Sequence, residues 1–153
     1  MWRSGKRREI EMGELVNTGG GWTLEAEWTT KAGFPAYAMR SPERSDLEMT
    51  FSIYNRHRFF RCGYVVVPET HPRHTKGERL MSFGSMTDGI NFSNETTYIG
   101  PPHVVGMTGT AFGFDCNHLW HIERYEPESL DRVRYECEEL AMALKAVGEE
   151  EGS

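Results

Sequence analysis

The feature that most constrains the fold is a helical pattern of apolar residues near the C-terminal end of the chain. These residues recur at spacings of three and four, while Glu, Asp, Arg and Lys fill the positions between them. The pattern predicts one amphipathic helix that begins at Pro127 or Ser129 and ends with Gly148 in the C′ position. Its apolar stripe consists of Leu130, Val133, Cys137, Leu140, Ala141, Leu144 and Val147.

The chain before this helix has the alternation of apolar and polar residues that is typical of half-buried strands. Thr87-Asp88-Gly89 separates two apolar segments and predicts a hairpin turn, because both central residues of a type I′ turn need a positive φ. The sequence therefore predicts an α+β fold, in which an antiparallel β-sheet carries one C-terminal amphipathic α-helix packed on it. The expected strands are residues 22–28, 34–39, 47–54, 59–67, 80–86, 90–93 and 111–116, with a possible extension over 119–122.

Composition indicates one domain between two charged ends. We expect a flexible basic tail over residues 1–21, a single α+β domain over 22–148 and an acidic tail over 149–153. The formal net charge of −6 argues against a nucleic-acid partner. No apolar run reaches the ~20 residues that span a bilayer, and no secretory leader precedes the domain. Three widely spaced cysteines fit a reducing compartment, so a cytoplasmic protein is expected.

The densest group of chemically active residues follows the last predicted strand. Cys116 and His118 share one face of an extended strand and are candidates for a thiolate–imidazole pair, although a free cysteine beside phenylalanines is more often a buried apolar residue. His118 and His121 are weak candidates for metal ligands, because no CxxC or HExxH motif accompanies them. No cofactor-binding motif is present either, so no cofactor is expected.

A third interpretation is a ligand pocket built from polar residues at strand ends, where small side chains allow a ligand to approach closely. Taken singly, each of these residues also has an ordinary explanation as a turn or strand-end residue. The predicted ligand-binding residues are Arg61, His71, Asp88, Gly89, Asn91, Ser93, Asp115 and His118.

Several sequence blocks occur together in a recognisable order: Gly33 to Arg40, then Cys62 to Pro68 followed by His71-Pro72, then Asp88 to Ser93, and finally Phe112 to His118. Over residues 33–147 the chain resembles a family of small phage and prophage proteins with the pattern CGYVxVPxxHP, GGLTFS and WWxGFDCxH. Two departures stand out: Asp88 replaces the first glycine of the GG pair, and Leu119-Trp120-His121 follows His118. The positions matching the family pattern are Cys62, Gly63, His71, Pro72, Gly89, Ser93, Asp115, Cys116 and His118.

The resemblance implies a phage accessory protein that acts in the host cytoplasm, but it brings no activity with it. The leading hypothesis is that the protein binds a small polar or anionic ligand without turnover, for example to sequester a nucleotide-type host defence signal. Two alternatives stay open: a metal- or Cys/His-dependent hydrolase, and a protein–protein inhibitor of a host factor that acts through exposed aromatic residues. A homo-oligomer is also expected, since pockets can form between protomers.

Overall fold

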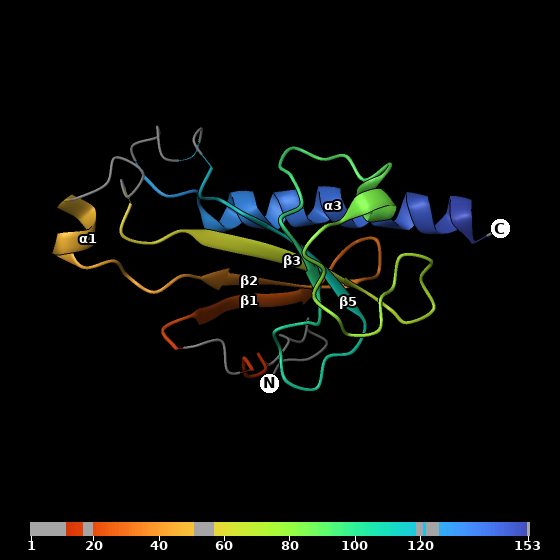
Figure 1. Cartoon of the computed structure of the whole chain (residues 1–153), viewed down its shortest axis with the longest axis horizontal. Coiled ribbons are helices and arrows are strands. Elements are labelled where there is room, and N and C mark those ends of the chain that lie inside the picture. Colours follow the sequence, from red (N-terminus) through yellow and green to blue (C-terminus); the bar gives the residue numbers. More distant parts are fainter. Residues whose placement is uncertain (1–11, 17–19, 51–56, 119–120, 122–125, 153) are drawn as a thin grey trace, which may run out of the picture.

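A five-stranded antiparallel sheet with one long helix across it forms the body of the computed structural model, which describes residues 12–16, 20–50, 57–118, 121 and 126–152 (Figure 1). This arrangement confirms the predicted α+β fold. The strands are β1 (Thr23–Thr29), β2 (Pro35–Arg40), β3 (Arg61–Val67), β4 (Tyr98–Gly100) and β5 (Thr110–Asp115). The helices are α1 (Asp46–Thr50), the 3₁₀ turn η1 (Gly84–Thr87) and α3 (Leu130–Glu151).

The strands lie in the order β1-β2-β3-β5-β4, so β3 and β5 occupy the interior of the sheet beside β2. Helix α3 packs on the face that β2 and β3 share with β5, and its predicted apolar stripe from Val133 to Val147 is buried there. Ser129 caps the helix by accepting a hydrogen bond from the Arg132 backbone N–H. The predicted helix start at Ser129 is therefore confirmed.

Two glycines on the central strands are covered by aromatic rings of the paired strand. Gly63 pairs with Phe114, and Gly113 pairs with Tyr64. A Cβ at Gly63 would lie 2.5 Å from Phe114 Cζ and 2.7 Å from Cys137 Sγ. A Cβ at Gly113 would lie 2.3 Å from Tyr64 Cδ2 on the opposite face. The absent side chains thus let one ring lie on each face of the sheet, and let α3 approach β3 closely.

The second face of the sheet carries its own aromatic cluster. Tyr37 stacks on Tyr64 with ring centroids 4.8 Å apart, and the Tyr37 hydroxyl contacts His103 Nδ1 at 2.8 Å. Burial lowers the pKa of His103 to about 4, so this imidazole is neutral. Its Nδ1 accepts a hydrogen bond from the Tyr37 hydroxyl. Segment 13–16 crosses near this cluster, where Leu15 forms an isolated bridge with Val104. Part of the predicted flexible tail therefore contacts the domain.

The strand predicted over 47–54 is wrong in its described part, because residues 46–50 form helix α1; residues 51–54 lie outside the described residues. The physical reason is a capping box: the Ser45 backbone N–H donates to Glu48 Oε1, and the Glu48 N–H donates back to Ser45 Oγ. These reciprocal bonds satisfy backbone donors at the start of a helix. Leu47, expected to face the core, is 67% exposed.

The predicted hairpin over 80–93 is also wrong. Residues 84–87 form η1, and residues 90–93 form no strand. Gly89 has the expected positive φ of 80°, but Asp88 has φ −61° and ψ 128°, and the Ile90 N–H donates to the Thr87 carbonyl. These values describe a type II turn, which needs a positive φ only at its third residue. Beyond it, β4 lies in residues 94–110, between the predicted strands, where the sequence indicates only a loop. The predicted extension over 119–122 falls almost wholly outside the described residues.

Helix α3 continues past Gly148 to Glu151, so the prediction of Gly148 as the C′ residue is wrong. Gly152 is the C-cap residue instead, and its backbone N–H donates to the Gly148 carbonyl. The last turn is held by Arg73, whose guanidinium forms a two-point contact with the Glu151 carboxylate. No helix in the described ranges is long and apolar enough to cross a membrane.

Candidate functional site

The structure divides the predicted ligand-binding residues into two groups at opposite ends of α3. His71, Asp88 and Gly89 lie by its C-terminal half, where His71 contacts the Leu144 carbonyl and Gly89 packs near Val147. Ser93 and Asp115 lie by its N-terminal half, since Ser93 contacts Glu136 and Asn94 bridges Glu136 and the Asp115 carbonyl. His118 lies next to Asp115. Glu136 and Leu144 are separated by about 12 Å along the helix axis at 1.5 Å per residue. His71 and His118 therefore do not share a pocket.

His71 is a buried residue that docks the helix onto the loop after β3. Its Nδ1 accepts a hydrogen bond from the Arg73 backbone N–H at 2.9 Å, which leaves Nε2 to donate to the Leu144 carbonyl at 2.8 Å. Both nitrogens of a neutral imidazole are thereby satisfied. This arrangement accounts for His71 as a structural residue.

A test of this docking uses Gly148, whose added Cβ would lie 2.7 Å from His71 Nε2. Glycine-to-alanine replacement inside a helix ordinarily stabilises by about 1 kcal/mol. We expect Gly148→Ala to destabilise the wild-type protein by about 1–2 kcal/mol through this clash. In a His71→Ala background the same change should stabilise. Urea unfolding of the four proteins measures this, and an equal effect of Gly148→Ala in both backgrounds would contradict the account.

Around the second group, polar side chains fasten the irregular segment 91–97 to α3 and to the end of β5. Ser93 Oγ donates to Glu139 Oε1, and Asn94 Nδ2 donates to Glu136 Oε1 at 3.4 Å. Asn94 Nδ2 also lies 3.3 Å from the Asp115 carbonyl oxygen. These contacts fix a segment that has no regular secondary structure of its own.

His118 lies between two carboxylates just beyond β5. Its Nε2 is 3.3 Å from Glu95 Oε1, and its Nδ1 is 3.7 Å from Asp115 Oδ1. Asp115 also accepts a hydrogen bond from the Asn117 backbone N–H at 3.0 Å. The imidazole thus links segment 91–97 to the end of β5.

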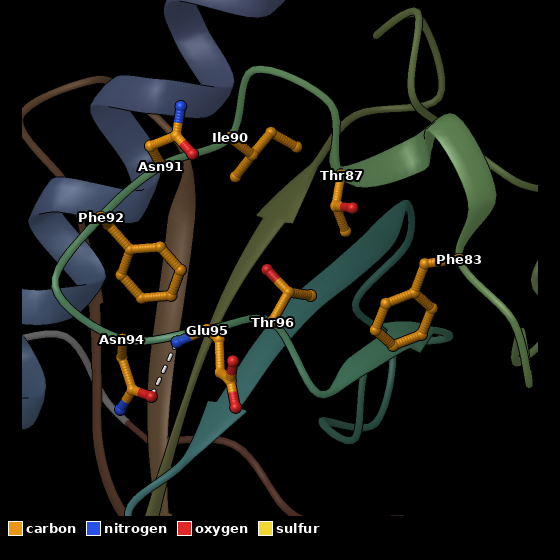
Figure 2. Close-up of a pocket in the computed structure, with 8 residues that line it drawn as sticks. All are labelled: Phe83, Thr87, Ile90, Asn91, Phe92, Asn94, Glu95 and Thr96. Atoms are coloured by element: carbon orange, nitrogen blue, oxygen red, sulfur yellow. Dashed lines mark hydrogen bonds between the residues drawn. The ribbon is translucent and has the colours of Figure 1, made fainter.

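A cavity of about 350 Å³ opens beside this fastened segment (Figure 2). Phe83 and Phe92 stand on opposite sides of the space, and Thr87 and Thr96 lie between them. Asn91, one of the predicted ligand-binding residues, is on its wall. The residues lining the cavity are Phe83, Thr87, Ile90, Asn91, Phe92, Asn94, Glu95 and Thr96.

Glu136 is the buried anchor of the segment, with only 3% of its surface exposed. Burial raises the pKa of its carboxyl above the ordinary 4.5, with a smaller contribution from Glu128, while Asn94, Arg132 and Ser93 oppose the rise. Arg132 Nε approaches Glu136 Oε2 at 3.4 Å. The carboxylate is thus held by contacts from both α3 and segment 91–97.

The raised pKa of Glu136 predicts a pH dependence of stability. The folded protein holds the Glu136 proton more tightly than the unfolded chain, so this residue's contribution to stability falls as pH rises above 4.5 through the folded-state pKa. Glu136→Gln should remove that fall, and the exposed Glu150→Gln should keep it. Urea unfolding over a pH series measures the difference from wild type. Parallel wild-type and Glu136→Gln profiles would contradict the prediction.

Cys116 is a buried residue of the core rather than a reactive group of the site. Cys116 is 1% exposed in the helix-side core, and burial raises the pKa of its thiol strongly, with further contributions from Glu136 and Glu128. A thiol with a raised pKa is a poor nucleophile, which argues against the Cys116–His118 catalytic pair.

Arg61, a predicted ligand-binding residue, has a structural role. It pairs with Glu25 at 2.7 Å and donates to the Glu128 carbonyl, so its guanidinium links β3 to β1 and to the start of α3.

The candidate metal ligands His118 and His121 have ring centroids 5.3 Å apart, and the His118 backbone N–H donates to His121 Nδ1. Within the described part of the chain, no group of three or more His, Cys, Asp or Glu side chains is arranged to hold a metal ion.

Three residues that matter at these two sites were missed from the sequence: Arg73, Asn94 and Glu136. Arg73 is one of several basic residues in a polar loop, and Glu136 is one of three glutamates in positions 136–139 of α3. A signal did exist for Glu136, because it lies one position from Cys137 and three from Val133 on the buried side of the helix. Comparison with protein-family models, with curated proteins and with solved structures finds no match.

Proposed function

We propose that the protein binds a small polar ligand with a flat apolar portion in the cavity beside segment 91–97, without turning it over. The observation that carries this proposal is the cavity itself, which combines two phenylalanine walls with hydroxyl, amide and carboxylate groups. Its volume of about 350 Å³ lies in the range of small-molecule sites.

The walls favour a planar ring. Phe83 and Phe92 lie on opposite sides of the cavity, and Phe92 is itself supported by an edge contact with Phe114 at 5.4 Å. A flat heterocycle in the cavity gains stacking or edge contacts with an aromatic ring on its wall. Thr87, Thr96 and Asn91 supply hydroxyl and amide groups that fix its orientation.

The charges around the cavity favour a ligand that donates hydrogen bonds. Glu95 lines the cavity, and Asp115, Glu136 and Glu139 lie around the segment that forms it. These carboxylates accept hydrogen bonds and repel phosphate. Of the polar and the anionic ligand expected from the sequence, we therefore propose the polar one, such as the base and sugar of a nucleoside.

The groups near the cavity support binding rather than turnover. Burial raises the pKa of the Cys116 thiol, so this thiol is not poised as a nucleophile. The Ser93 hydroxyl, which donates a hydrogen bond to Glu139, does not line the cavity. In the same proposal, the resemblance of residues 33–147 to phage proteins supports an accessory role in the host cytoplasm, where sequestering a nucleotide-type defence signal would need only its base to enter the cavity. The homo-oligomer expected from the sequence is also part of this proposal.

Isothermal titration calorimetry with adenosine, guanosine, cytidine, uridine and their 5′-monophosphates tests the proposal. We expect saturable binding of at least one nucleoside, at least as tight as its monophosphate. Thr96→Phe, which fills the cavity, and Glu95→Gln should weaken that binding at least tenfold. The exposed Glu78→Gln is the matched control and should bind as wild type does. No saturable binding of any nucleoside, or binding that Thr96→Phe leaves unchanged, would contradict the proposal.

A further inference from the structure

A second cavity of about 350 Å³ lies between the loop after β3 and the loop before β5, at the end of the sheet where Val67 pairs with Thr110. It shares no lining residue with the cavity of Figure 2. Pro101, Pro102 and Met107 give it an apolar surface, and Glu69, His74 and Lys76 bring charged or titratable groups to its wall.

The orientation of His74 in this cavity is set by a buried hydroxyl. Thr110 is 1% exposed, and its Oγ1 accepts from the Thr75 backbone N–H at 2.8 Å and lies 3.1 Å from the Thr75 carbonyl, to which it donates. The hydroxyl has one proton, so the contact with His74 Nδ1 at 2.8 Å is satisfied when Nδ1–H donates to Thr110. In the neutral imidazole this leaves Nε2 as a hydrogen-bond acceptor.

The two charged residues on the wall are exposed and of opposite sign. No ion pair joins Glu69 or Lys76 to any residue that the structure describes, in contrast to Arg73 and Arg61, which are both paired with carboxylates. The lining of this cavity thus includes a carboxylate, an imidazole and an ammonium group together with an apolar surface. A ligand that meets all of them is a small zwitterion with an apolar side chain.

We propose that this second cavity binds an α-amino acid with an apolar side chain. The ligand ammonium donates to the Glu69 carboxylate and to His74 Nε2, and the ligand carboxylate accepts from the Lys76 ammonium. The side chain lies against Pro101, Pro102 and Met107, where it leaves water. This inference does not depend on the nucleoside cavity.

The test is a titration of the full-length protein with L-leucine and L-methionine, followed by ¹⁵N-resolved NMR. We expect saturable shifts in residues 69–77 and 101–109. N-acetyl-L-leucine lacks the ammonium and L-leucinamide lacks the carboxylate, so both should bind at least tenfold more weakly. Glu69→Gln and Lys76→Gln should each weaken leucine binding at least fivefold, and the exposed Lys31→Gln is the control.

Equal binding of leucine and N-acetyl-L-leucine would overturn the proposal, as would the absence of saturable shifts in these two loops. Both test residues are exposed, so the variants should fold, and an unchanged thermal midpoint verifies this before each titration. If Lys31→Gln weakens leucine binding as much as Lys76→Gln does, the proposal is also overturned, because a general effect of net charge would then explain both results.

Discussion

Replacing Arg73 by alanine is expected to lower the free energy of unfolding by about 3 kcal/mol. Arg73 is 8% exposed, and all five of its N–H donors are used. Three of them bond the carbonyls of Ser85, Met86 and Asp88, which close η1 and the turn after it. This value counts only the three carbonyl contacts, at about 1 kcal/mol each, because the hydrogen bonds are partly buried and water replaces part of each loss.

The two remaining donors hold Glu151, and their loss should fray the last turn of α3. Hydrogen exchange at residues 148–151 should accelerate in Arg73→Ala, while exchange around Val133 and Cys137 reports only the global loss of stability. Arg73→Lys should recover less than half of the stability, since an ammonium has three donors where the guanidinium has five. Arg79→Ala, at an exposed arginine that lies over the Tyr98 ring, is the control and should cost less than 1 kcal/mol. An Arg73→Ala protein as stable as Arg79→Ala would contradict the proposed stabilising role of the five Arg73 hydrogen bonds.

Adding a single methyl group at Gly63 is expected to cost about 2–4 kcal/mol. The new Cβ would lie 2.5 Å from Phe114 Cζ and 2.7 Å from Cys137 Sγ, in the layer between β3, β5 and α3. Neither neighbour is at the surface, so the strand pair and the helix must move apart. The change should therefore loosen α3 as well as the sheet.

A double-mutant cycle separates this clash from a general strand effect. Phe114→Leu removes the ring that covers Gly63, so Gly63→Ala should cost at least 1 kcal/mol less in the Phe114→Leu background than in the wild type. Urea unfolding of the four proteins gives the coupling. Additive effects of the two substitutions on the free energy of unfolding would contradict the predicted clash between the new Cβ at position 63 and the Phe114 ring.

Periodicity predicted the elements whose burial is one-sided and regular. The stripe from Val133 to Val147 marks α3, and the ends of β1, β2, β3 and β5 lie within two residues of the strands expected from alternation. Where a local hydrogen-bond motif competes with alternation, the motif prevails, as the capping box at Ser45 and the type II turn at Gly89 show. The three residues of β4 are too few for any period to reveal.

The candidate site was predicted only in part, because its residues are brought together by register and by α3 rather than by sequence spacing. Asn91, Ser93, Asp115 and His118 do lie in or beside the first cavity. His71 is held by the Leu144 carbonyl at the other end of the helix. The Asp88 carbonyl is bonded by Arg73, and the neighbouring Thr87 and Ile90, not Asp88 itself, line the cavity. Nothing in a single sequence tells which of several glutamates on α3 faces inward against a loop, so the role of Glu136 required the fold.

The most direct test of the central claim is a map of where a nucleoside perturbs the protein. We would record ¹⁵N-resolved NMR spectra of the full-length protein during titration with the nucleoside that calorimetry finds to bind best. The account predicts saturable shifts concentrated in residues 83–96, with smaller ones at Asp115 and His118. Shifts that spread over the surface without saturation, or that gather at residues away from 83–96, would contradict the assignment of the cavity in Figure 2 as the ligand site.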